Sequence, residues 1–155
     1  MNAEIIIVGK PKTPFIKAGI RRYLTWIRAY LNLEIKVVQA VNKKTKSIDE
    51  IKKIETENIL KKIEKHSKKI LLDVRGEFLT SSEFATFVKK WQNSGRENLN
   101  LIIGGAFGFS NEMYDQNWKR LSLSPMTLTH EMVLLFLLEQ IYRAETIIVG
   151  KKYHY

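Results

Sequence analysis

The chain has 155 residues, 45% of them hydrophobic, and its 26 Lys and Arg residues exceed its 16 acidic residues to give a net charge of +10. This length and composition predict one folded domain and exclude a disordered chain. The lack of cysteine excludes disulfide scaffolds, thiolate metal sites and cysteine nucleophiles, and it fits a reducing compartment.

The start of the chain, MNAEIIIVGK, differs from a signal peptide, because Glu4 interrupts its short apolar run and no basic stretch precedes it. The longest unbroken apolar run, Met132–Leu138, is far shorter than the roughly 20 residues that a membrane-spanning helix needs. We therefore expect a soluble protein of the cytoplasm that has no membrane partner.

Apolar, β-branched runs alternate with helical patterns along the whole chain. The predicted strands are Glu4–Val8, Glu34–Gln39, Lys69–Val74 and Leu99–Ile103. The predicted helices are Pro14–Ala29, Ser47–His66, Thr80–Gln92, a short one near Asn111–Asn117, and one from His130 to about Ala144. Continuous apolar strands are typical of sheets that are covered on both faces. The order therefore predicts an α/β fold with a mostly parallel sheet and helices on both faces.

Much of the positive charge lies between Lys43 and Lys69, where ten lysines face five acidic residues. A solvated helix face with i,i+4 ion pairs is one interpretation of this segment. Attraction of a polyanion, above all nucleic acid, is the other. Charge alone does not decide between them.

The segment GGAFGFS, Gly104–Ser110, directly follows a predicted strand. Its G-G-x-x-G spacing matches neither the dinucleotide fingerprint nor the P-loop. A sharp turn explains one glycine, whereas three in five residues favour close approach of the backbone to a ligand. Ligands of open parallel sheets bind at the carboxyl ends of strands, where this segment begins.

The segment LSLSPMTLTH, Leu121–His130, alternates apolar and hydroxyl residues before the last helix. It fits a fifth strand followed by a helix cap at Thr127 or Thr129. It equally fits a loop whose backbone groups grip a flat heterocycle.

In the last helix, Glu139 and Arg143 share one face at i,i+4 spacing. They form either a surface ion pair or a partly buried pair beside a pocket, where the arginine would offer a fixed positive charge. The three histidines, His66, His130 and His154, lack metal-ligand spacing and no acidic cluster completes a site, so we expect no metal. No nucleophile elbow or Ser-His-Asp pattern supports a hydrolase.

Several spaced motifs together resemble the ribosomal RNA large subunit methyltransferase H family of SPOUT methyltransferases. They are IIGGAFGFS, LSLSPMTLTH, LEQIYRA, the terminal G-x-x-YH, Val8–Lys10 and LLDVRG, and they span essentially the whole chain. The resemblance implies a single SPOUT domain over residues 1–155, Rossmann-like, with a C-terminal trefoil knot at about 98–155. It implies S-adenosylmethionine as methyl donor, and a homodimer that methylates N3 of a pseudouridine in 23S rRNA on assembled ribosomes.

The resemblance also implies site residues. For cofactor binding it implies Leu72, Gly104, Gly105, Leu123, Ser124, Pro125, Met126, Thr127 and Leu128. On the substrate side it implies the catalytic residues Glu139, Arg143, Tyr153 and His154. We hypothesise that His154 accepts the N3 proton and that Arg143 stabilises negative charge on the uracil ring.

The chain departs from the family's pattern in three places. Thr129 stands where proline is common, Leu134 where arginine is common, and Lys152 where proline is common. The change at position 134 would remove a contact to RNA or substrate. A non-catalytic RNA-binding module on the same fold is therefore the alternative. A nucleotide-dependent oxidoreductase is disfavoured because the dinucleotide fingerprint and its ribose-binding acid are missing.

Overall fold

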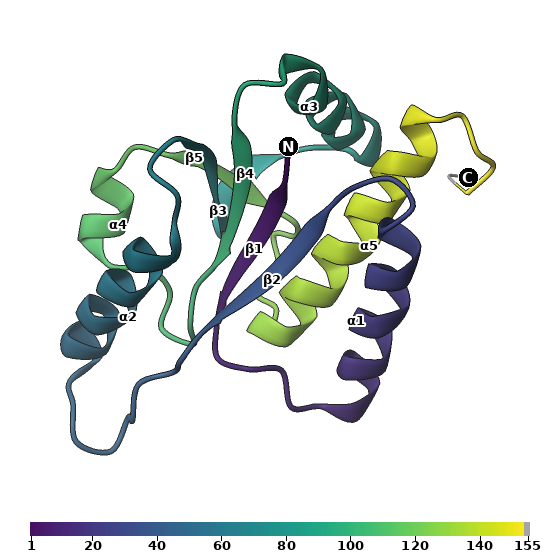
Figure 1. Cartoon of the computed structure of the whole chain (residues 1–155). Helices are drawn as coiled ribbons and strands as arrows, with labels where there is room; N and C mark the ends of the chain where they lie inside the picture. The colour runs from purple at the N-terminus through teal and green to yellow at the C-terminus, as the bar shows by residue number, and fades with distance from the viewer. Residues whose placement is uncertain (154–155) are drawn as a thin grey trace.

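The computed structural model describes residues 1–153, in which strands and helices alternate strictly along the chain (Figure 1). The strands are β1 (Ala3–Val8), β2 (Leu33–Val38), β3 (Ser67–Phe78), β4 (Asn98–Ile103) and β5 (Lys119–Ser122). The helices are α1 (Pro14–Ile27), α2 (Ile48–Lys62), α3 (Ser81–Ser94), α4 (Asn111–Asp115) and α5 (His130–Ile148).

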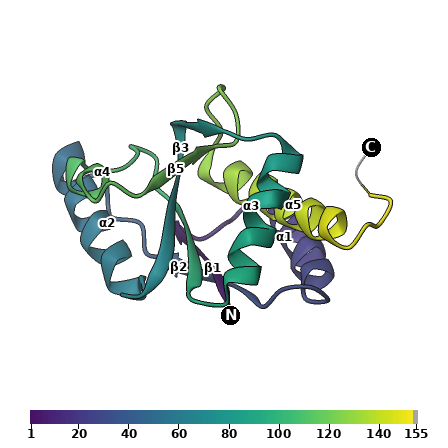
Figure 2. The same ribbon diagram turned by 90° about the horizontal axis from the view of Figure 1, so that it is seen from above.

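The five strands form one parallel sheet in the order β2-β1-β4-β3-β5. Helices α1, α3 and α5 cover one face and α2 and α4 the other, as the view from above makes plain (Figure 2). The predicted α/β fold with helices on both faces is confirmed. Within residues 1–153, no helix is long and apolar enough to cross a membrane.

The continuous apolar strands fill two cores, one on each side of the sheet. Successive side chains of a strand point to opposite faces. Ile5 and Ile7 accordingly pack under α1, α3 and α5, while Ile6 packs under α2 and α4. Leu134 is fully buried in the first core, so the side chain at this position fills the interior and does not mark a lost surface contact to RNA.

Element boundaries differ from the prediction mainly around β3 and β5. β3 continues to Phe78, with an irregularity in its pairing with β5 between Leu72 and Glu77. Gly76 lies where β5 passes closest, since a Cβ there would come within 2.7 Å of the β5 backbone. β5 ends at Ser122, so most of the alternating hydroxyl segment is a loop.

Side-chain caps fix the starts of the helices much as the sequence indicates. Ser47 caps α2, and Thr80 with Glu83 forms a complete capping box on α3. Thr129, one of the two predicted caps, accepts a hydrogen bond from the backbone N–H of Met132 at the start of α5. α5 then runs on to Ile148, beyond the predicted end at Ala144.

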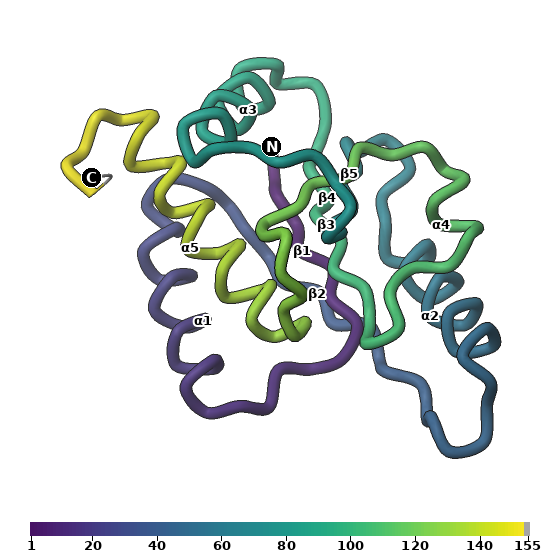
Figure 3. The backbone as a smooth tube through the Cα atoms, turned by 180° about the vertical axis from the view of Figure 1, so that it is seen from behind, coloured from purple at the N-terminus to yellow at the C-terminus, as the bar shows by residue number. Residues whose placement is uncertain are grey.

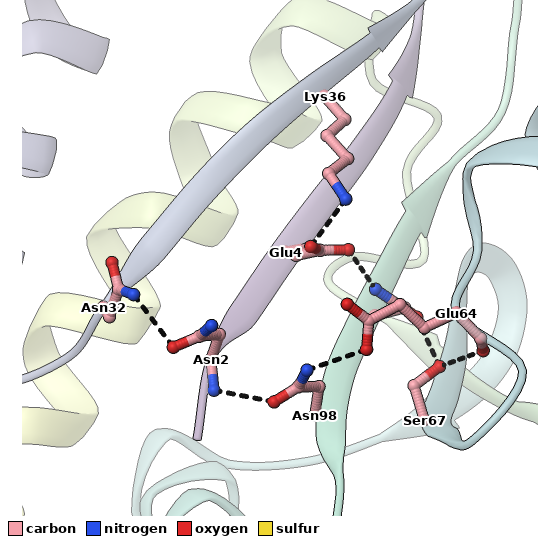
Figure 4. A network of polar contacts seen from close by, with 8 residues as sticks. Asn2, Glu4, Asn32, Lys36, Glu64, Ser67 and Asn98 are labelled. Atoms are coloured by element: carbon pink, nitrogen blue, oxygen red, sulfur yellow. Dashed lines mark hydrogen bonds and ion pairs between the residues drawn. The ribbon is translucent and has the colours of Figure 1, made fainter.

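A polar network crosses the amino ends of four strands, at the edge of the sheet opposite the functional loops (Figure 4). Glu4 of β1 is almost fully buried and accepts hydrogen bonds from Lys36 Nζ (2.6 Å) and Asn100 Nδ2 (2.8 Å). Asn100 in turn accepts one from Ser67 Oγ. The hydrogen bond to Glu4 raises the pKa of Lys36. Because each strand supplies a partner, the network fixes the register of β2, β1, β4 and β3.

Replacing Asn100 with alanine would leave the buried Glu4 carboxylate with Lys36 alone. We expect Asn100→Ala to lower the free energy of unfolding by about 2 kcal/mol, the usual cost of an unsatisfied buried polar group. Urea unfolding measures the change. Asn98→Ala, in a more exposed part of the network, serves as the control and should cost less. Equal losses in the two variants would contradict the role assigned to Asn100.

Candidate functional site

A cavity of about 530 Å³ opens at the carboxyl ends of β4 and β5, beside the middle of β3 where its pairing with β4 ends. Its walls are Leu72–Val74 of β3, the glycine loop after β4, the segment Leu121–Thr129, and the first turn of α5. The backbone trace shows the segments that follow β4 and β5 close together in front of the sheet (Figure 3). This is the edge at which open parallel sheets bind ligands.

The cavity brings together nearly all of the residues that the sequence assigns to cofactor binding. Eight of the nine line it, and Pro125 does not. The lining members are Leu72, Gly104, Gly105, Leu123, Ser124, Met126, Thr127 and Leu128. Their roles in binding stay predictions.

The glycine loop uses its three glycines in different ways. Gly108 has a φ of +78°, the left-handed backbone that glycine adopts readily. At Gly104 a Cβ would lie 3.1 Å from the Phe109 ring, and at Gly105 it would lie 2.5 Å from a carboxylate oxygen of Glu55. One glycine therefore serves the turn, and the other two permit close approach of neighbouring groups.

Glu55 of α2, which sequence reasoning missed, supports the back of the glycine loop. Burial raises the pKa of this carboxyl group and Lys43 partly offsets the effect. Its neighbour Thr56 shares a 2.5 Å hydrogen bond with Ser110, and Lys43 lies over the Phe107 ring. The available signal was an acidic residue at i,i+4 spacing between the buried Ile51 and Ile59, in the middle of an apolar stripe.

The segment between β5 and α5 is a loop that binds its own backbone. Ser122 Oγ donates to the carbonyl of Ser124 at 2.9 Å, and Ser124 Oγ accepts from the N–H of Met126 at 3.0 Å. Both interpretations of this segment hold in part: Leu121 and Ser122 belong to the fifth strand and Thr129 is the helix cap, while the residues between them form a loop that lines the cavity.

The first turn of α5 also holds the loop between β1 and α1, a contact that the sequence did not indicate. Glu131 accepts hydrogen bonds from Thr13 Oγ1, at 2.6 Å, and from the backbone N–H groups of Lys12 and Thr13. These bonds lower the pKa of Glu131 to about 2. They fix the start of α5, where His130 and Val133 line the cavity.

Glu139, Arg143 and Tyr153 form a second cluster, called here the α5 cluster. Arg143 Nη2 lies 2.5 Å from Glu139 Oε1, and the guanidinium lies 4.9 Å from the centre of the Tyr153 ring. Tyr153 donates to the same carboxylate at 3.2 Å. The Glu139 and Arg143 side chains are about one-fifth exposed, so the pair is partly buried rather than a surface ion pair. His154 lies outside the described residues.

The hydrogen bond to Glu139 raises the pKa of Arg143, so the guanidinium is a permanent cation. Burial, followed by the charge of Glu139, raises the pKa of Tyr153 well above its ordinary value, so its phenol stays protonated and acts as a donor. The α5 cluster therefore offers one fixed positive charge and one hydroxyl donor.

The cavity and the α5 cluster lie at different positions along α5. The cavity touches the helix at His130 and Val133, whereas Arg143 lies ten residues further on, about 15 Å along the axis. Within one chain, the predicted cofactor residues are therefore not brought into one pocket with Glu139, Arg143 and Tyr153, the predicted catalytic residues that the structure describes. In the described part of the chain, no group of three or more His, Cys, Asp or Glu residues could hold a metal ion.

The cavity has the chemistry of a nucleoside site. Leucine and valine side chains suit a flat heterocycle, and glycine backbone and hydroxyl groups suit its polar substituents. The fold and this cavity together define a parallel α/β protein that binds a nucleoside-like ligand at the carboxyl edge of its sheet.

Comparison with known proteins gives the family. A family model described as predicted SPOUT methyltransferase matches residues 1–154. Proteins named ribosomal RNA large subunit methyltransferase H from Kosmotoga olearia and from Geobacter sp. are 53% and 43% identical, over 100% of this chain and 100% and 99% of theirs. The chain belongs to the ribosomal RNA large subunit methyltransferase H family of SPOUT methyltransferases.

Solved structures agree on the fold. A probable methylase family protein from Haemophilus influenzae superposes with a TM-score of 0.56 at 14% identity, over 99% of this chain and 70% of that one. SPOUT methyltransferases use S-adenosylmethionine, which is accordingly the cofactor of this protein, and the apolar walls and glycine loop of the cavity fit it.

The contact between Gly105 and Glu55 predicts a steric effect on cofactor affinity. Gly105→Ala should weaken S-adenosylmethionine binding at least tenfold, because the new methyl group would push the loop away from Glu55 and into the cavity. Calorimetry measures the dissociation constant. The double variant Gly105→Ala/Glu55→Ala should recover part of the affinity, since it removes the colliding carboxylate. Failure of this recovery would contradict the steric explanation.

Proposed function

We propose that this protein is a methyltransferase that modifies N3 of a pseudouridine in 23S rRNA on the assembled ribosome, in the cytoplasm. The observation that carries the proposal is end-to-end similarity to relatives named ribosomal RNA large subunit methyltransferase H, in a chain whose glycine loop and Leu123–Leu128 segment line one cavity. The net charge of +10 supports an RNA partner.

The cavity would hold S-adenosylmethionine through backbone groups of the glycine loop and the Leu123–Leu128 segment, with Leu72 packing against it. When bound, the cofactor supplies an electrophilic methyl group. The chain's own task is to exclude water and to hold the target nitrogen in line, and such orientation can supply several kcal/mol of the barrier, of the order of 7 or more in favourable cases.

The α5 cluster would act on the substrate. His154 would accept the proton from N3, as imidazole does near neutral pH. Arg143, held by Glu139, would stabilise the negative charge that develops on the uracil ring. Tyr153 would position Arg143 through its ring and the shared carboxylate. No metal takes part in this scheme.

The separation along α5 supports a homodimer as the active form. A cluster that lies about 15 Å along α5 from the helix residues that line the cavity is displaced from a ligand there, but the α5 cluster of a second subunit could reach it. Large apolar side chains on α1 and α5 are exposed in the single chain, Phe15 by 66%, Trp26 by 40% and Phe136 by 38%. Burying them would favour association of the two helices with a second copy.

The family's architecture extends the proposal to the chain as a whole. We infer one SPOUT domain over residues 1–155, with the knotted segment at about 98–155. This segment contains β4, α4, β5 and α5, and thus most of the cavity wall.

Mass spectrometry of 23S rRNA tests the proposed function directly. A strain that lacks this protein should lose one methyl group from a single pseudouridine, and a plasmid copy should restore it. An unchanged modification profile would count against the function. If S-adenosylmethionine also fails to bind at millimolar concentration, the protein is a non-catalytic RNA-binding module instead.

Variants of the α5 cluster and of His154 separate catalysis from cofactor binding. Arg143→Ala should lower kcat at least a hundredfold and leave the S-adenosylmethionine dissociation constant within about twofold, because the proposed role of Arg143 is to stabilise charge on the uracil ring and not to hold the cofactor. His154→Ala should behave similarly. Tyr153→Phe keeps the ring over Arg143 and loses only the hydrogen bond to Glu139, so its effect should be smaller. Normal methylation by both alanine variants would contradict the assigned roles.

A further inference from the structure

Tyr114 of α4 lies at the rim of the cavity and contacts two arginine side chains. The Arg75 guanidinium lies 5.0 Å from the centre of the Tyr114 ring, and Arg75 Nη2 donates to the Tyr114 hydroxyl at 2.8 Å. The Arg120 guanidinium lies 5.4 Å from the same centre. Tyr114 itself lines the cavity, whereas both arginine side chains are exposed. The arrangement is called here the rim cluster.

Asp73 anchors the rim cluster to the cavity wall. Its side chain is 5% exposed, accepts a hydrogen bond from the Tyr114 hydroxyl, and also accepts one from the backbone N–H of Arg75 at 2.9 Å. Burial alone would raise the pKa of Asp73. The hydrogen bonds from Tyr114 and Arg75, with the charges of Arg75 and Arg120, hold it below its ordinary value. The carboxylate is thus a fixed anion that orders Tyr114 and Arg75.

The charges of the rim cluster do not cancel. Asp73 balances one of the two arginines, at 3.7 Å from Arg75 Nε. Within residues 1–153, the ion pairs between β3 and its neighbours here are Arg75–Asp73 and Lys119–Glu77, and neither includes Arg120. An excess positive charge therefore remains at the mouth of the cavity, in contact with solvent.

Lys119 and Arg120 are neighbours on β5, but they serve different faces of the sheet. Lys119 pairs with Glu77 at 3.0 Å and lies near the Phe87 ring of α3, on the face covered by α1, α3 and α5. Arg120 lies against Tyr114 of α4, on the other face. Arg120 lies beside the cavity because successive side chains of β5 point to opposite faces of the sheet. Lys119, on the other face, is therefore a matched control for a change of charge at Arg120.

We propose that Arg75 and Arg120 form a phosphate-binding site for the backbone of the substrate RNA, next to the nucleotide that enters the cavity. The inference rests on the proposed function and extends it to a defined contact. Guanidinium groups bind phosphate oxygens through paired N–H donors, and Tyr114 holds both of them without using up all of those donors. A phosphate contact positions an RNA and carries no sequence information.

The competing ligand for such a cluster would be a base stacked on Tyr114. Both arginines already lie over this ring, and the Phe109 ring packs edge-on against it at 6.0 Å. A base would have to displace one of them, whereas a phosphate binds to the exposed guanidinium edges as they stand. The geometry thus favours phosphate.

The test compares Arg120→Gln with Lys119→Gln in the full-length protein. Ribosomes purified from a strain that lacks the protein serve as the RNA, and binding and methylation are measured over a series of salt concentrations. Arg120→Gln and Arg75→Gln should each raise KM severalfold with kcat nearly unchanged, and should each reduce the slope of log K against log salt by about 1. S-adenosylmethionine affinity and the thermal midpoint of Arg120→Gln should equal those of the wild type.

Two further variants sharpen the result. Arg120→Lys keeps the charge but loses the planar fork, and should fall between the wild type and Arg120→Gln. Lys119→Gln removes the same charge one residue away and should change KM and slope much less. If Arg120→Gln behaves like Lys119→Gln on ribosomes that the wild type methylates, the rim site is wrong and the proposed function stands. If the wild type neither binds nor methylates ribosomes, both fall together.

Discussion

The parallel direction of all five strands is the constraint on which the site depends. Because the carboxyl ends of parallel strands meet at one edge, the segments after β4 and β5 converge there, beside Leu72–Val74 of β3, although they are far apart in sequence. A one-residue slip of any strand would turn its buried side chains to the opposite face and displace its loop. The buried network around Glu4 and Asn100 holds the register at the other edge. The polar contacts at the amino ends of the strands thus help to fix the shape of the cavity at their carboxyl ends.

The glycine loop shows how two layers meet in this site. α2 lies on one face of the sheet, yet its Glu55 and Thr56 contact the loop that forms the cavity wall. A buried carboxylate normally requires compensation, and here the exposed Lys43 provides part of it from the lysine-rich segment. The two interpretations of that segment are therefore not exclusive. Most of its lysines are exposed, as on a solvated face, while Lys43 also belongs to the support of the cofactor loop.

Much of this arrangement could be predicted from the sequence, and the remainder could not for identifiable reasons. Uninterrupted runs such as IIIV reveal strands buried on both faces, and Ser47 and Thr80 reveal helix starts, because these signals are local. The contact of Glu55 with Gly105 joins residues fifty positions apart, and the bond of Glu131 to Thr13 joins residues more than a hundred apart. Nothing local requires either contact. At position 134 the sequence pattern was misleading in the opposite way. Leucine departs there from the family pattern, yet this residue lies in the core and not at a functional surface.

The distribution of positive charge follows from the same geometry. Arg143 is paired with Glu139 and Arg75 with Asp73, so each of these two guanidinium groups is held in place by a largely buried acid. Within residues 1–153, Arg120 and most lysines of α2 form no such ion pair, and they are exposed to solvent. A paired arginine has a fixed position and suits a developing charge on a substrate. An exposed, unneutralised cation suits a phosphate backbone, whose counterions it replaces. Arg143, partly buried and held by Glu139, thus suits the reacting base, whereas Arg75 and Arg120, both exposed beside Tyr114, suit the RNA backbone around it.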